Sequence, residues 1–103
     1  MDAYTWGLVA RLLQSWPDLQ EGRWPVPQDT GVQPGYRGQR AFPVAGFEAA
    51  LEASADLWLA VGRLERRGQG LLARAVVRRY LGRRRVPYRW NELVEAVYWA
   101  VNW

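Results

Sequence analysis

The stretch FEAALEASADLWLAVGRLER, residues 47–66, carries the clearest structural signal in the chain. Its apolar side chains recur every three or four positions, which is the spacing of one face of an α-helix. Acidic side chains stand in the first turns of this stretch and arginines stand at its end, an order that suits the helix dipole. The apolar row, with one serine, consists of Phe47, Leu51, Ser54, Leu57, Trp58, Val61 and Leu64. The pattern predicts a helix over residues 46–66.

The same spacing predicts three further helices, over residues 2–16, 71–81 and 90–101. Asp2 is placed to cap the first of them, and Pro17 to stop it. No stretch alternates apolar and polar residues as a strand would, and there is no internal repeat. We therefore expect a single all-α domain of three to four helices spanning residues 1–103.

Between the first two predicted helices the composition changes. Residues 17–46 hold five of the six prolines and five of the ten glycines. Such a connection is far longer than the usual 4–6 residues within a compact domain, so residues 17–45 form either a mobile linker or an extended arm. The aromatic side chains of Trp24, Tyr36 and Phe42 favour an arm. It would dock on the rest of the chain or on another copy of it.

Several function classes are excluded by what the chain lacks. It contains no cysteine and no histidine, so neither a Ser-His-Asp triad nor a zinc site with nitrogen or sulfur ligands can form. The carboxylates of Glu48, Glu52 and Asp56 share one helix face, as they would on any solvated face. We therefore expect no enzyme, no catalytic or metal-binding residue and no cofactor. Without a signal peptide or a membrane span, we expect a cytoplasmic protein.

Positive charge is concentrated in one part of the sequence. Ten of the fourteen arginines lie within residues 63–89 beside a single acid, Glu65, giving this window a formal charge of +9 against −5 for the rest. Mutual repulsion within such a block favours a polyanionic partner. The predicted phosphate-binding residues are Arg63, Arg67, Arg74, Arg78, Arg79, Arg83, Arg84, Arg85 and Arg89.

Two other interpretations of these arginines stay open. They could form a solvated face, some of them paired with acids elsewhere in the chain, or they could bind an acidic protein. The acids available for pairing include Glu48, Glu52, Asp56, Glu92 and Glu95.

The chain holds seven tryptophans. Five of them fall on predicted helices, where we expect core positions: Trp6, Trp16, Trp58, Trp90 and Trp99. The apolar ending YWAVNW, residues 98–103, is more than a chain of this size would cover. We therefore predict a partner interface, either in a homodimer or with a protein such as RNA polymerase. Its candidate residues are Trp24, Tyr36, Phe42, Trp99 and Trp103.

Four segments carry a family resemblance: DLWLAVGRL at 56–64, the pair Leu71-Leu72, VRRYLG at 77–82 and WNELVEAV at 90–97. Together they resemble sigma-factor region four, most of all its short versions in phage late transcription regulators and antiterminators. The resemblance implies a phage or prophage transcription regulator that binds double-stranded DNA. Only residues 98–103 follow, which leaves no room for a separate recognition helix. Either the last helix reads bases, or base reading is lost.

We therefore expect a small basic helical regulator that binds double-stranded DNA as a dimer. The alternative is a non-enzymatic interaction or assembly module that uses the arm and the C-terminal tryptophans.

Overall fold

The computed structural model describes residues 4–24 and 43–103, and in these residues every regular element is a helix. The helices are α1 (Trp6–Gln14), α2 (Trp16–Gln20), α3 (Pro43–Arg66), α4 (Gly70–Tyr80) and α5 (Trp90–Val101). The prediction of an all-α fold is confirmed, and the helices predicted at 46–66, 71–81 and 90–101 match α3, α4 and α5 closely.

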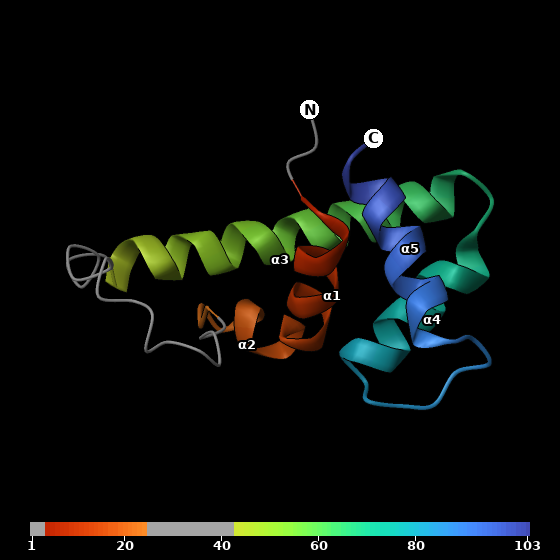
Figure 1. The fold of residues 1–103 in the computed structure, drawn as a ribbon, viewed down its shortest axis with the longest axis horizontal. Helices are drawn as coiled ribbons and strands as arrows, with labels where there is room; N and C mark the ends of the chain where they lie inside the picture. The colour runs from red at the N-terminus through yellow and green to blue at the C-terminus, as the bar shows by residue number, and fades with distance from the viewer. Residues whose placement is uncertain (1–3, 25–42) are drawn as a thin grey trace.

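Helix α3 is the axis of the molecule, and α2, α4 and α5 all pack against it (Figure 1). With 24 residues it is about 36 Å long. Helix α1 bridges α2 and α5. The two ends of the described chain meet on one side of the molecule, where Tyr4 contacts Asn102 (Figure 1). No helix in residues 4–24 or 43–103 combines the length and the apolar composition needed to cross a membrane.

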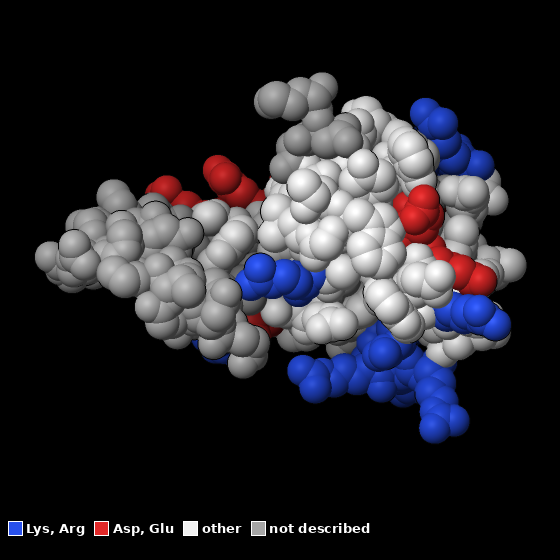
Figure 2. Space-filling model, in the orientation of Figure 1, with Lys and Arg blue, Asp and Glu red and all other residues white. Residues whose placement is uncertain are grey.

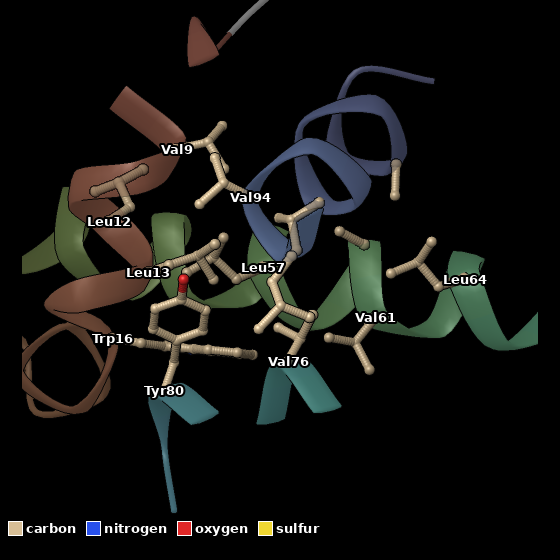
Figure 3. Close-up of a cluster of buried hydrophobic side chains, with 14 of the residues drawn as sticks. Val9, Leu12, Leu13, Trp16, Leu57, Val61, Leu64, Val76, Tyr80 and Val94 are labelled. Carbon is tan, nitrogen blue, oxygen red and sulfur yellow. The ribbon is translucent and has the colours of Figure 1, made fainter. Parts of the chain in front are cut away.

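The core lies where α1, α3, α4 and α5 converge (Figure 3). The largest side chain in it is Trp16, which is fully buried. Its indole N–H donates a hydrogen bond of 3.1 Å to the hydroxyl of Ser54, the one buried polar side chain among the described residues. The indole N–H thus has a hydrogen-bond acceptor although it is buried, as a tryptophan in a protein core requires. The other large, fully buried side chains are Leu12, Leu13, Leu19, Leu57, Leu64, Leu93, Val9, Val76, Val94 and Val97.

The first predicted helix proved to be two. Helix α1 begins at Trp6, after Thr5, whose hydroxyl accepts a hydrogen bond from the N–H of Leu8. The chain breaks at Ser15, and Pro17 then stands in the first turn of α2, where its missing N–H would have had no helical partner. The proposed arm is therefore wrong for residues 17–20, which belong to α2, and for residues 43–45, which begin α3. The fully buried Leu19 shows that α2 belongs to the core. Asp2 and residues 25–42 lie outside the described residues.

The prediction that helical tryptophans occupy the core holds for Trp16 and is wrong for three others. Trp58, Trp90 and Trp99 are 43%, 53% and 55% exposed. Trp58 lies at the edge of the buried face of α3, and Trp90 is the first residue of α5. Trp99 points away from the face of α5 that Leu93, Val94, Val97 and Ala100 bury. Trp6 is half-buried and packs edge-on against Trp90, with ring centroids 5.7 Å apart.

Candidate nucleic-acid interface

Six of the nine predicted phosphate-binding arginines lie on α4 and on the connector that follows it. We call them the arginine surface: Arg74, Arg78, Arg79, Arg83, Arg84 and Arg85. All six are exposed. The opposite face of α4 is buried and consists of small and branched side chains together with Tyr80. Burial raises the pKa of Tyr80, and the positive charge of the nearby Arg79 opposes this shift. Amphipathic α4 therefore turns its arginines outward because its other side forms the core.

The connector folds back beneath the last turn of α4. The N–H of Gly82 donates to the carbonyl of Val77 at 3.0 Å, and the N–H of Arg84 donates to the carbonyl of Arg78 at 2.9 Å. A Cβ at Gly82 would lie 2.9 Å from that Arg78 oxygen, so this approach needs glycine. Arg83 turns the chain with a φ of 55°, in the left-handed region. The turn places the arginines of the connector beside those of α4.

Two hollows connect these side chains into one surface. The first, of about 270 Å³, lies between α4 and the connector and includes Arg74, Arg78 and Arg85 in its lining. The second, of about 360 Å³, is lined by Val86 and by Arg79, Arg83, Arg84 and Arg85. Arg85 belongs to both. Figure 2 shows basic side chains gathered along the lower edge of the molecule, where Figure 1 places α4 and the connector.

Among the described residues, no acidic side chain forms an ion pair with the arginine surface. Within residues 4–24 and 43–103, the ion pairs join Arg23 to Asp18 at 2.8 Å and to Glu21 at 2.6 Å. The acids considered as pairing partners therefore form no ion pair with a described arginine: Glu48, Glu52, Asp56, Glu92 and Glu95. Close, exposed and unpaired guanidinium groups repel one another and raise the local positive potential.

The other three arginines have different surroundings. Arg63 donates a hydrogen bond of 2.8 Å to the carbonyl of Ala100, at the C-terminal end of α5. The guanidinium of Arg67 lies 3.8 Å from the ring centroid of Trp103, a cation–π contact. Arg89 is the exposed N-cap residue of α5, and its backbone N–H donates to the carboxylate of Glu92 at 3.3 Å. Arg63 and Arg67 thus hold the end of α5, apart from the arginine surface.

The predicted partner interface is only partly described. Tyr36 and Phe42 fall outside the described residues. Trp24 and Trp103 are 41% and 42% exposed. The indole N–H of Trp99 donates to one carboxylate oxygen of Glu95 at 2.8 Å.

Glu95 also accepts on its other oxygen, from the indole of Trp6 at 3.0 Å. A single carboxylate therefore bridges Trp6 of α1 and Trp99 of α5. Their rings, with Trp90 beside Trp6, form an aromatic cluster on the α1–α5 side.

One carboxylate of α3 has a partner in the segment before α1. Asp56 accepts a hydrogen bond from the phenol of Tyr4, and burial together with this bond raises the pKa of Tyr4 above its usual value. Among the described residues, no three acidic side chains are placed so that they could hold a metal ion.

Sequence reasoning missed the apolar residues inside the basic block. Leu71, Val86 and Tyr88 line the first hollow beside its arginines. One signal was available: Leu71 lies off the apolar stripe of its helix, and Tyr88 interrupts a run of arginines. The comparisons found no match for this chain among protein-family models, curated proteins or solved structures.

Proposed function

We propose that this protein binds DNA, chiefly by holding backbone phosphates on the arginine surface. The observation that carries the proposal is that six exposed arginines, unpaired with any described acid, adjoin one another along α4 and its connector. Guanidinium groups fit phosphate oxygens in bidentate geometry, and every phosphate neutralised releases counterions. No described feature points to contact with particular base edges, so the binding we propose depends on backbone charge.

The resemblance of residues 56–97 to sigma-factor region four suggests the biological role of such DNA binding, namely the regulation of phage or prophage transcription. That part of the proposal rests on the sequence alone. In the described structure α5 is half covered by α1 and α3, and its outward side carries aromatic residues and Glu95. We therefore assign phosphate contacts to α4 and its connector, and none to α5.

The test is fluorescence anisotropy of a labelled DNA duplex at about 50 and about 200 mM salt. Six phosphate contacts would lower the affinity by about a thousandfold between these concentrations. In the variant Arg78→Gln/Arg85→Gln, the slope of log affinity against log salt should become shallower by about 2, because each contact contributes about 1. Arg78 and Arg85 are chosen because both line the first hollow.

A matched control is Arg11→Gln/Arg66→Gln, which removes the same charge from two exposed arginines outside the arginine surface. Its salt slope should stay close to that of the unchanged protein. Equal slopes for the two double variants, or an affinity that ignores salt, would contradict the proposal.

A second candidate is self-association through the aromatic cluster, in keeping with the predicted dimer. It is favoured by the exposure of Trp90 and Trp99, 53% and 55%, since exposed tryptophans are enriched in interfaces. Sedimentation of the protein and of Trp90→Gln/Trp99→Gln across a range of concentrations tests it. A monomer at all concentrations would dismiss this candidate and leave the DNA proposal intact.

A further inference from the structure

The hollow between α4 and the connector combines two kinds of chemistry. We call it the α4 hollow, and its lining consists of Leu71, Arg74, Ala75, Arg78, Arg85, Val86, Pro87 and Tyr88. Five of these eight side chains are apolar or aromatic, and the other three are arginines of the arginine surface. A surface that only held phosphates would have no use for the apolar part.

The apolar part is accessible from solvent. Leu71 is 72% exposed, more than any other large hydrophobic side chain among the described residues. Tyr88 and Val86 are half-buried and pack partly against the core, which fixes their position in the lining. A held aromatic ring beside free guanidinium groups is the arrangement with which proteins bind single-stranded nucleic acid: bases stack on the ring and phosphates meet the charges.

Size and charge narrow the choice of occupant. At about 270 Å³, the α4 hollow lies below the usual range of about 300–1,000 Å³ for pockets that take drug-sized ligands. It therefore suits one aromatic ring system with a small sugar. Three arginines around it favour an occupant that carries negative charge on both sides, as a nucleotide within a strand does. A paired base in a duplex must first be unstacked and unpaired to enter such a hollow, whereas a base in a single strand does not bear that cost.

We propose that the α4 hollow takes one unpaired base of a DNA strand, stacked against Tyr88 and Leu71, while the flanking phosphates contact Arg78 and Arg85. The protein then binds single-stranded DNA more tightly than duplex of the same length. This inference rests on the proposed function, because the same arginines hold the backbone. It adds the form of DNA that the site prefers.

The experiment compares three labelled probes of about 20 nucleotides: a thymidine strand, its duplex with an adenine strand, and a strand of abasic sites. The abasic strand keeps the phosphates and removes the bases. We expect the thymidine strand to bind about 5- to 150-fold more tightly than the other two. Stacking of one base corresponds to a factor of about 5 to 150 in affinity, so Tyr88→Leu should lose that much on the thymidine strand and nothing on the abasic strand.

Matched variants separate stacking from folding. Tyr88→Phe keeps the ring and should bind as the unchanged protein does. Trp90→Leu removes an exposed aromatic ring outside the α4 hollow and should likewise have no effect. Leu71→Gln alters the hollow at a largely exposed residue, where the substitution should affect folding little, and should weaken binding of the thymidine strand alone.

The outcomes distinguish this inference from the proposed function. Equal affinity for the thymidine and abasic strands, with Tyr88→Leu and Leu71→Gln unchanged, would overturn the base-binding hollow and leave phosphate binding standing. Failure to bind any of the three probes at low salt would overturn both.

Discussion

Tyr4 and Asn102 are joined by two hydrogen bonds, although 98 positions separate them in the sequence. The N–H of Tyr4 donates to Oδ1 of Asn102 at 3.3 Å, and Nδ2 of Asn102 donates to the carbonyl of Tyr4 at 3.0 Å. The phenol of Tyr4 donates in turn to Asp56 on α3. Tyr4 thus connects the segment before α1 to both α3 and the end of α5. Ionisation of its phenol should therefore lower the free energy of unfolding.

We expect the protein to lose stability as the pH rises above about 10, and Tyr4→Phe to lose less. The pKa of Tyr4 is raised in the folded protein by burial and by its bond to Asp56. Above the ordinary tyrosine pKa of about 10, the unfolded chain therefore gives up this proton more readily than the folded one, and unfolding becomes easier. Below that pH the contribution of the bond is complete.

Urea unfolding between pH 8 and 11.5 measures this effect, and the composition of the chain makes the result simple to interpret. The chain has no lysine and no cysteine, so in this range its titrating side chains are tyrosines. Tyr80, whose pKa is also raised by burial, accounts for part of the slope that remains in Tyr4→Phe. An unchanged slope in Tyr4→Phe would show that its phenol is not held in this way.

Arg63→Ala should lower the free energy of unfolding by about 1.5–3 kcal/mol, the usual contribution of a hydrogen bond to a charged group. Its guanidinium donates to the carbonyl of Ala100, where α5 has no further turn to satisfy that oxygen. Urea denaturation followed by circular dichroism measures the change. Arg66→Ala, at an exposed position one turn on, should change stability by less than about 0.5 kcal/mol.

Arg83→Gly should leave the protein as stable as before or more stable by up to about 1 kcal/mol, since glycine adopts the left-handed conformation of this residue without strain. Arg84→Gly removes the same charge at a residue whose φ is not positive, and should destabilise by about 0.5–1 kcal/mol. Thermal unfolding of the two variants compares them directly. Equal losses of stability would mean that Arg83 carries no backbone strain.

Ser54→Ala should destabilise the protein by about 1 kcal/mol, because the buried indole N–H of Trp16 loses its acceptor. Gln20→Ala removes the acceptor of an indole as well, that of Trp58, whose hydrogen bond is exposed. Water replaces the lost acceptor there, so the change should stay below about 0.5 kcal/mol. Chemical denaturation of both variants checks the difference, and equal effects would contradict a role for burial.

The long helices could be predicted because their apolar spacing depends on the local sequence alone. The division of the N-terminal segment into α1 and α2 could not be predicted in this way. Pro17 gives the same signal whether it ends one helix or stands in the first turn of the next, and only the packing of Leu19 against α3 distinguishes the two. Trp58 and Trp90 satisfied the helical spacing too, but how much of a stripe is buried depends on the neighbouring helices.

The clustering of Arg74, Arg78 and Arg79 was predictable from spacing on one helix. Arg63 was grouped with them because it is close in sequence, yet its partner Ala100 is brought to it only by the packing of α3 against α5. The α4 hollow was hidden for a similar reason. It exists because the turn at Gly82 and Arg83 carries Tyr88 back toward α4, and no periodic pattern encodes such a return.

The separation of charge along α3 has a kinetic consequence. Glu48 and Glu52 lie in the first half of this helix, whereas α4 and the connector, which carry the arginine surface, lie beside its other half (Figure 1). Among the described residues, these negative and positive side chains are therefore separated along the direction of α3. If the proposed DNA binding holds, the negative potential of the strand attracts the α4 side and repels Glu48 and Glu52, so that a larger share of collisions would occur with α4 facing the strand.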